Sequence, residues 1–232
     1  MLDFNQFEVL TFDCYGTMID WETGVLAALA PIFKAHGVSM SNAEAFKLYR
    51  TLEPEAEHGA WQNYKGVLRT VLQGFGTQLG FTPTEAELDQ FAHSVKDWPA
   101  FPDSPGALLA LSQKYKLGVL SNVDDDLFAY SAKKLEAPFT YLITAEQIHS
   151  YKPAPKHFET AFERIGLPKE HILHVAQSLF HDIKIAKTLG LSTVWVNRGY
   201  GRGVSMTPPA EAVPDLEVPD LATLARLVGV SA

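Results

Sequence analysis

The stretch "LTFDCYGTMIDWETG" (residues 10–24) ends an apolar run with Asp13 and places Gly16 and Thr17 just behind it. A short apolar run of this kind is typical of a β-strand buried on both faces. An aspartate after such a strand can be a nucleophile or a metal ligand, but it also commonly serves the turn that ends the strand. Its role therefore depends on which residues stand at the ends of the other strands of the chain.

Four short runs rich in Val, Ile and Leu predict buried parallel strands, at residues 7–12, 116–121, 171–176 and 192–197. Segments with helical spacing lie between them, at residues 104–115, 155–166 and 179–190, with Pro near a start or Gly at an end. This alternation predicts an α/β fold with a doubly wound, Rossmann-like parallel sheet.

Residues 21–98 interrupt this alternation, because they hold several helical patterns and no convincing strand. The three prolines of residues 98–106 mark a return to the strand-and-helix pattern. We therefore expect an α/β core made of residues 1–20 and 99–232, with a helical cap domain at residues 21–98. The Pro-rich, acidic residues 207–220 predict an ordered surface segment or a short tail.

Composition narrows the class of function. The chain has 232 residues, 47% of them hydrophobic, and a net charge of −8. Nucleic acids and anionic membranes bind positive patches, so neither is an expected partner. No apolar window approaches the roughly 18 residues that span a bilayer, and we find no signal peptide. The single cysteine, Cys14, needs no oxidising compartment, and the expected location is the cytoplasm.

Polar residues come directly after successive strands. Asp13 follows the first, Ser121 and Asn122 the second, and Asp182 opens the helix after residues 171–176, with Lys152 in a preceding loop. Each has an ordinary explanation as a helix cap, a loop charge or a helix ion pair. Ligands of open parallel sheets bind beyond the carboxyl ends of the strands, however, so the set in this order predicts a catalytic site.

The motifs around these residues resemble those of the haloacid dehalogenase superfamily. They are "FDCYGTMID" (12–20), "VLSN" (119–122), "SYKPAPKHF" (150–158) and "HVAQSLFHDIKIAKTLG" (174–190), with the helical insertion where that superfamily carries its cap. The resemblance implies that Asp13 is the nucleophile and that Lys152 steadies its charge. It also implies that Asp182 completes the site and that Ser121 and Asn122 bind the anionic group of the substrate.

Departures from the superfamily's magnesium-dependent phosphatases decide the expected chemistry. Those enzymes carry a second Asp two positions after the nucleophile, where this chain has Tyr15. They also carry an Asp after a Gly in the fourth motif, where this chain has Gln177 after Ala176. Magnesium prefers carboxylate oxygens, so we expect no metal and no other cofactor. Without a metal, the repulsion between Asp13 and a phosphate dianion disfavours phosphoryl transfer.

Tyr15 instead resembles the (S)-2-haloacid dehalogenase branch. In that chemistry a carboxylate displaces halide from the carbon beside the substrate's carboxylate, and water hydrolyses the resulting aspartyl ester. The resemblance implies metal-independent conversion of a small 2-haloacid to the 2-hydroxy acid through an ester on Asp13. The expected catalytic residues are Asp13, Thr17, Lys152 and Asp182, and the expected substrate-binding residues are Tyr15, Arg50, Trp61, Ser121, Asn122, Gln177 and His181.

Several of these assignments have a structural alternative. Arg50 would bind the departing halide, but a solvated ion pair with Glu53 fits equally well. Trp61 and Tyr64 would wall the pocket, although aromatic residues at helical spacing commonly belong to a core. His181 would activate water or serve as a polar neighbour at a helix start.

The match to the dehalogenase branch is incomplete, because Phe158, Gln177 and Leu179 stand where it has tyrosine, serine and asparagine. The expected partner is a small halogenated carboxylic acid, with the halide, the acid and the stereochemistry open. A homodimer is one open arrangement. Two other functions stay open: a magnesium-dependent small-molecule phosphatase, and an inactive binding protein that kept the fold.

Overall fold

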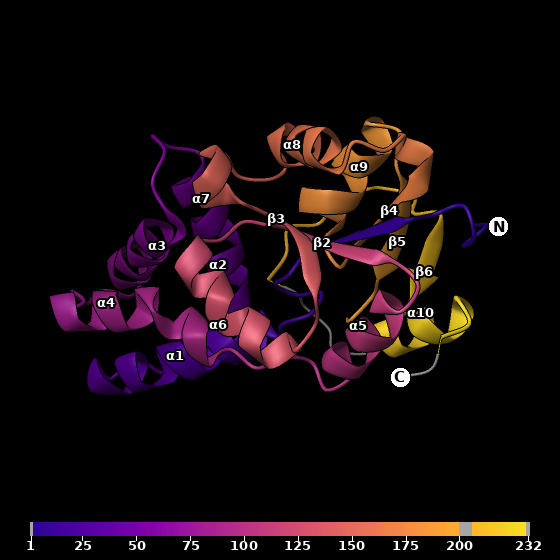
Figure 1. Ribbon diagram of the computed structural model, residues 1–232. Coiled ribbons are helices and arrows are strands. Elements are labelled where there is room, and N and C mark those ends of the chain that lie inside the picture. Colours follow the sequence, from indigo (N-terminus) through magenta and orange to yellow (C-terminus); the bar gives the residue numbers. More distant parts are fainter. Residues whose placement is uncertain (1, 200–205, 231–232) are drawn as a thin grey trace.

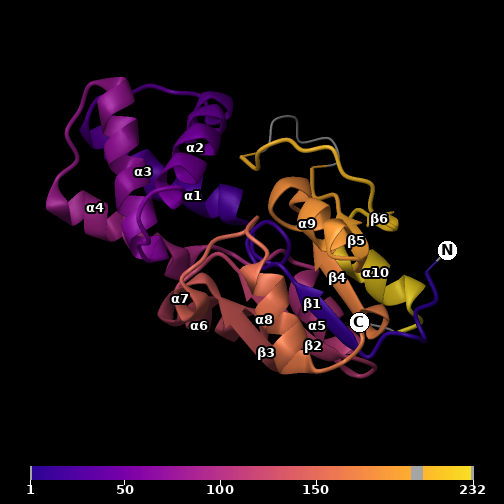
Figure 2. The same ribbon diagram turned by 90° about the horizontal axis from the view of Figure 1, so that it is seen from above.

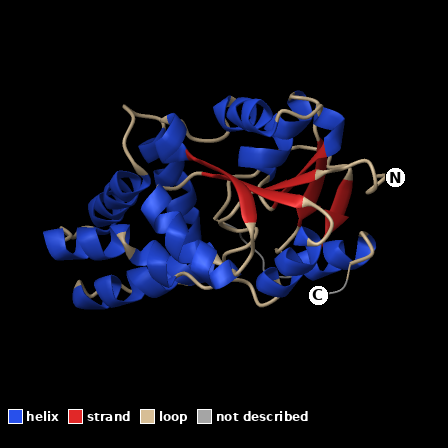
Figure 3. Ribbon diagram, viewed as in Figure 1, coloured by secondary structure: helices blue, strands red, loops and turns tan. Residues whose placement is uncertain are grey.

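A six-stranded parallel sheet forms the centre of the computed structural model, which describes residues 2–199 and 206–230 (Figures 1 and 3). The strands are β1 (Val9–Phe12), β2 (Lys116–Ser121), β3 (Phe139–Thr144), β4 (Ile172–Ala176), β5 (Ser192–Val196) and β6 (Leu216–Val218). Their order, β3-β2-β1-β4-β5-β6, winds outward in both directions from β1. The carboxyl end of β1 therefore lies at the switch point, where sheets of this type bind their ligands.

The predicted α/β sheet is confirmed, and four of its strands lie where the sequence placed them. Two strands, β3 and β6, were not predicted. β3 is an edge strand whose first residues are only partly buried, so it lacks the continuous apolar run of its neighbours. β6 has 3 residues and lies inside the Pro-rich segment 207–220, which we expected to be a surface segment or tail.

Helices cover both faces of the sheet: α8 and α9 lie on one face, and α5 and α10 on the other (Figure 1). The helical segments outside residues 21–98 are α5 (Ser104–Ser112), α6 (Asp125–Leu135), α7 (Ala145–Ile148), α8 (Lys156–Ile165), α9 (Lys184–Thr188), α10 (Leu221–Leu227), the 3₁₀ turn η2 (Lys169–His171) and the π-helical turn η3 (Leu179–Ile183). Successive strand residues face opposite sides. Accordingly, Val9 packs in a cluster with Phe158 of α8, and Leu10 in a cluster with Leu108 of α5.

Helices alone fill the insertion between β1 and α5: α1 (Trp21–Ala35), α2 (Asn42–Glu57), α3 (Tyr64–Leu79), α4 (Glu85–Ala92) and the 3₁₀ turn η1 (Ser94–Asp97). Capping boxes start two of them, Ser41 with Glu44 on α2 and Thr84 with Glu87 on α4. Figures 1 and 2 show α1–α4 grouped beside the sheet. We call residues 21–98 the cap, and its exact division from the core stays a prediction. Every described helix is too short or too polar to cross a membrane.

The two connections between cap and core run side by side. The Asp20 N–H donates to the carbonyl of Pro99 at 2.8 Å, and Ile19 pairs antiparallel with Ala100. The Phe101 N–H donates to the carbonyl of Met18 at 3.0 Å. The chain thus leaves the sheet and returns to it at one place, beside the turn that carries Asp13.

Candidate active site

Asp13 lies in the turn that follows β1, and its backbone N–H donates to the Val175 carbonyl of β4 at 3.1 Å. Gly16 allows that turn to close, because its φ of +95° suits glycine alone and its N–H donates to the Ile19 carbonyl at 2.8 Å. A Cβ atom on Gly16 would come within 2.9 Å of the Gln177 side-chain oxygen. The glycine therefore brings the turn after β1 close to the turn after β4.

Two donors hold the Asp13 carboxylate. The Thr17 hydroxyl donates to Oδ2 at 2.7 Å, and the Lys152 ammonium donates to Oδ1 at 2.9 Å. Thr17 Oγ1 in turn accepts the Gln177 backbone N–H at 2.9 Å, which directs the hydroxyl proton toward Asp13. The carboxylate is thus fixed from both sides and only 6% of Asp13 is exposed.

Lys152 is buried with all three of its ammonium hydrogens in use. Besides Asp13, its Nζ donates to Asp182 Oδ1 at 2.7 Å and to the Leu120 carbonyl at 2.8 Å. Burial alone would lower the pKa of Lys152, but the two carboxylates raise it above its ordinary value. Lys152 is therefore a permanent positive charge between two acids.

Asp182 lies in the π-helical turn η3 and shares its Oδ1 between Lys152 and His174 Nε2, the latter at 3.1 Å. The other ring nitrogen of His174 contacts Thr11 Oγ1 at 3.0 Å. Burial would raise the pKa of Asp182, but Lys152 and His174 hold it well below its usual range. His174 was not predicted from the sequence, although a single histidine inside an apolar strand was the available signal.

The protonation behaviour of Asp13 follows from the same arrangement. Burial raises the pKa of Asp13, the Lys152 ammonium opposes that rise, and the Asp182 carboxylate adds to it. A carboxylate with a raised pKa is more basic than a solvated one. Asp13 is therefore more basic than an exposed aspartate, and Lys152 favours its ionised form.

The strand-end residues Ser121 and Asn122 play different parts. Asn122 Oδ1 accepts the Lys152 backbone N–H at 2.7 Å, and its Nδ2 donates to the Lys152 carbonyl at 3.1 Å and to Glu57 Oε1 at 3.3 Å. The amide thus positions the lysine loop. Ser121 Oγ is buried without a hydrogen-bond partner among the described residues, which leaves this hydroxyl available to a ligand.

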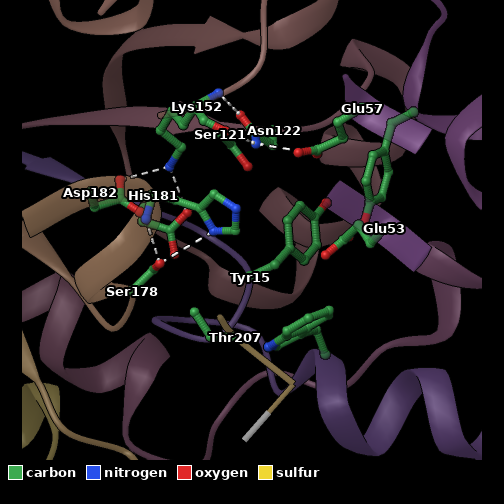
Figure 4. A pocket seen from close by; sticks show the side chains of 13 residues that line it. Tyr15, Glu53, Glu57, Ser121, Asn122, Lys152, Ser178, His181, Asp182 and Thr207 are labelled. Carbon is green, nitrogen blue, oxygen red and sulfur yellow. Dashed lines mark hydrogen bonds and ion pairs between the residues drawn. The ribbon is translucent and has the colours of Figure 1, made fainter. Parts of the chain in front are cut away.

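A cavity of about 50 Å³ lies over Asp13, between core and cap (Figure 4). Core residues that line it are Asp13, Tyr15, Ser121, Asn122, Lys152, Ser178, His181, Asp182 and Thr207. Cap residues that line it are Trp21, Glu53, Glu57 and Tyr64. The cap thus contributes two carboxyl groups that were not predicted from the sequence to belong to the site.

The two glutamates lie four residues apart on α2. Glu53 is buried, and its Oε1 accepts the hydroxyls of Tyr49 at 3.0 Å and Tyr64 at 2.7 Å. Burial raises the pKa of Glu53 to about 7, against the two hydroxyls, which lower it. Burial and the neighbouring Glu53 raise the pKa of Glu57 well above its ordinary value. Both groups therefore resist ionisation.

His181 faces the cavity from η3, with its ring turned inward (Figure 4). Its Nδ1 lies 3.2 Å from Ser178 Oγ, which also accepts the His181 backbone N–H at 2.8 Å. Burial lowers the pKa of His181 to about 4, so the imidazole is neutral at neutral pH. A neutral imidazole can accept a proton from water.

The structure brings together most of the expected site residues. Asp13, Tyr15, Ser121, Asn122, Lys152, His181 and Asp182 line the cavity, and Thr17 contacts Asp13 directly. The hydroxyl of Tyr15, however, lies 3.1 Å from Ser131 Oγ, and its ring packs edge-on against Trp98. Tyr15 therefore contributes its ring to the cavity wall.

Three expected substrate-binding residues lie elsewhere. Arg50 is not among the described residues that line the cavity: α2 turns Tyr49 and Glu53 toward the core, and Arg50 lies about 100° around the helix from Tyr49. The Gln177 side chain accepts the Thr207 hydroxyl at 3.1 Å and only its backbone supports Thr17. Trp61 is 38% exposed and stacks on Tyr151, lining a neighbouring cavity of about 340 Å³.

The donor set does not fit a magnesium ion. No group of three or more His, Cys, Asp or Glu side chains within the described ranges is arranged to hold a metal. The Lys152 ammonium lies between Asp13 and Asp182 and donates to both, so a fixed cation already occupies the position between these carboxylates. A divalent ion there would face the positive charge of Lys152 at close range.

Comparisons with known proteins show which family this chain resembles. A sequence profile of the haloacid dehalogenase-like hydrolases matches residues 10–196. Haloacetate dehalogenase H-2 of Moraxella sp. (strain B) is 26% identical over 226 residues, covering 96% of this chain and 98% of that protein. (S)-2-haloacid dehalogenase 1 of Pseudomonas sp. (strain CBS-3) is 27% identical over 199 residues, covering 81% and 83%. The crystal structure of an L-2-haloacid dehalogenase superposes with a TM-score of 0.80 at 26% identity, covering 96% and 98%.

Proposed function

The chain belongs to the haloacid dehalogenase-like hydrolases, and from this premise we propose that it hydrolyses the carbon–halogen bond of a small 2-haloacid to give the 2-hydroxy acid. The observation that carries the proposal is a buried Asp13 held by Thr17 and by the fixed cation Lys152. Similarity to named dehalogenases supports the same chemistry.

In the first step, a carboxylate oxygen of Asp13 attacks the halogen-bearing carbon of the substrate. A carbon–oxygen ester bond forms as the carbon–halogen bond breaks, and the halide leaves with the bonding electron pair. The negative charge thus moves from Asp13 to the halide. The unpartnered Ser121 hydroxyl, on the core side of the cavity, donates to the carboxylate of the substrate.

In the second step, water attacks the carbonyl carbon of the Asp13 ester and releases the 2-hydroxy acid. The His181 imidazole accepts the proton of that water, because its ring faces the cavity and burial keeps the ring neutral at neutral pH. The proton then passes to solvent, and Asp13 returns as a carboxylate. The net reaction consumes one water and yields one hydroxy acid, one halide and one proton.

The test is halide release from chloroacetate, 2-chloropropionate and fluoroacetate, with a metal chelator present throughout. We expect release at an unchanged rate with and without the chelator. A single turnover in ¹⁸O-labelled water should leave the label in Asp13, because the first product oxygen comes from the enzyme. Absence of halide release, together with magnesium-dependent turnover of phosphate esters, would instead establish a phosphatase.

Replacing the nucleophile is the direct check on the ester. Asp13→Asn keeps the shape of the side chain and removes its charge, so we expect halide release to fall by about 10³-fold or more. The fold should persist, which circular dichroism and the thermal midpoint can verify. Substantial activity in a correctly folded Asp13→Asn protein would rule out the covalent route.

A further inference from the structure

The cap wall of the cavity carries carboxyl groups where a halide-binding group is needed. Among the described residues that line the cavity, Lys152 is the one cation, and its ammonium is already bonded to Asp13 and Asp182. Glu53 and Glu57 face the same space from α2. If both were ionised, a departing halide would approach two negative charges without a free cation opposite them.

The hydrogen bonds of Glu53 determine where its proton lies. Glu53 is buried, no described cation pairs with it, and the Glu57 carboxyl group lies near it, so its neutral form is favoured. In that form Oε1, which accepts the hydroxyls of Tyr49 and Tyr64, is the carbonyl oxygen. The proton of neutral Glu53 therefore lies on Oε2. Oε2 has no hydrogen-bond partner among the described residues, and Figure 4 shows the Glu53 carboxyl group beside the cavity.

The direction in which the halide leaves determines whether it meets the Oε2 proton of Glu53. A nucleophile attacks carbon from the side opposite the leaving group, so a halide displaced by Asp13 leaves toward the wall that faces Asp13. Asp13 is on the core side of the cavity and Glu53 is on the cap side. The core also anchors Tyr64, because Asp124 Oδ1 accepts the Tyr64 backbone N–H at 2.7 Å, so the tyrosine that orients Glu53 is itself fixed.

Building on the proposed dehalogenation, we propose that Glu53 acts as a neutral carboxylic acid whose Oε2–H donates a hydrogen bond to the halide as the carbon–halogen bond breaks. The halide takes the bonding electrons, and Glu53 keeps its proton. Glu53 would thus bind the departing halide, the role that the family resemblance suggested for Arg50. Hydrogen-bond donors aimed at a developing negative charge are a general means of lowering a barrier.

This arrangement makes the donor dependent on pH. The titratable groups around Glu53 are Tyr49 and Glu57 on α2, Tyr64 on α3, and across the cavity Asp13, Tyr15, Lys152, His181 and Asp182. Burial raises the pKa of Glu53 to about 7, so the Oε2 proton is present below that pH and lost above it. We expect kcat/KM to fall about tenfold per pH unit above the Glu53 pKa.

Glu53→Gln is the decisive variant, because an amide can accept the two tyrosine hydroxyls on its oxygen and present a donor that does not ionise. It should retain activity and lose the alkaline fall in kcat/KM. Glu53→Ala should lower kcat by about 10- to 100-fold across the pH range. The loss should be larger for fluoroacetate than for bromoacetate, since fluoride is the poorer leaving group. Glu55→Gln, an exposed change on the same helix, is the matched control.

Three results would overturn the assignment: an alkaline limb that persists in Glu53→Gln, equal losses for both halides in Glu53→Ala, or a loss in Arg50→Gln as large as in Glu53→Ala. Halide binding gives a readout that needs no turnover. Bromide should change the fluorescence of Trp21, a cavity residue, below pH 7 in the wild type and across the pH range in Glu53→Gln. If bromide binds this way but no haloacid is hydrolysed, the proposed function fails and the halide site stands; if bromide does not bind, the halide site fails.

Discussion

Thr17 shows how one hydroxyl links two turns of the site. It donates to Asp13 Oδ2 and accepts the backbone N–H of Gln177. Thr17→Val keeps the shape and removes both contacts, so we expect kcat/KM for halide release to fall by about 10- to 100-fold, the usual cost of a hydrogen bond to a charged group. Thr17→Ser retains the hydroxyl and should stay close to the wild type. Equal losses in both variants would point to packing instead.

Residue patterns predicted the core half of the site better than the cap half. Asp13 and Asp182 follow predicted strands, and strand ends converge by topology, so their meeting was predictable. Lys152 lies in the loop after α7, and its sequence motif, not a strand end, indicated its place in the site. Glu53 and Glu57 lie in "TLEPEAE", a stretch that is locally typical of a solvated, charged helix face. Their burial comes from the contact between cap and core, which no local pattern records.

The contact of α1 with the return segment of the chain should be sensitive to one added methyl group. A Cβ atom on Gly24 would lie 2.3 Å from the ring of Trp98, which is buried and packs on Tyr15. We expect Gly24→Ala to reduce the free energy of unfolding by about 1–3 kcal/mol despite the better helix propensity of alanine. Thermal melts can measure it. Gly59→Ala, whose Cβ meets no atom within 4 Å, should leave the midpoint unchanged.

At the level of elements, the strands that could be predicted from the sequence are those buried on both faces of the sheet. β1, β2 and β4 are interior strands with continuous apolar runs, and each was predicted. β3 and β6 lie at the two edges of the sheet and carry less apolar sequence. The segment 179–190 was expected to be one helix, but it begins as the π-helical turn η3 before α9, with Asp182 in that turn.

The stability of the whole molecule should respond to pH through its buried acids. The pKa of Glu53 rises from 4.5 to about 7 on folding, so its contribution is fully present below pH 4.5 and is lost as pH rises through 7. His181 acts oppositely: its pKa falls from 6.5 to about 4, so its contribution grows as pH rises from 4 to 6.5.

We therefore expect the unfolding free energy to decline as pH rises from about 6.5 through 7, where His181 no longer compensates for Glu53. Urea titrations between pH 4 and 8 can measure this. In Glu53→Gln the decline should be smaller, because one of the groups that titrate is gone. An identical decline in that variant would mean that Glu53 ionises equally readily in the folded and unfolded chain.

The adjacent crossings at Asp20 and Pro99 also bear on how such a protein diversifies. A segment whose two ends meet can be exchanged for another of different length without changing the pairing of the strands in the sheet. The nucleophile and its cation come from separate loops of the sheet and cannot be transplanted together. Recombination at this crossing would thus exchange the whole cap, including Glu53, Tyr49 and Tyr64, in one event. The resulting protein would keep Asp13 and Lys152 and could act on substrates with other leaving groups.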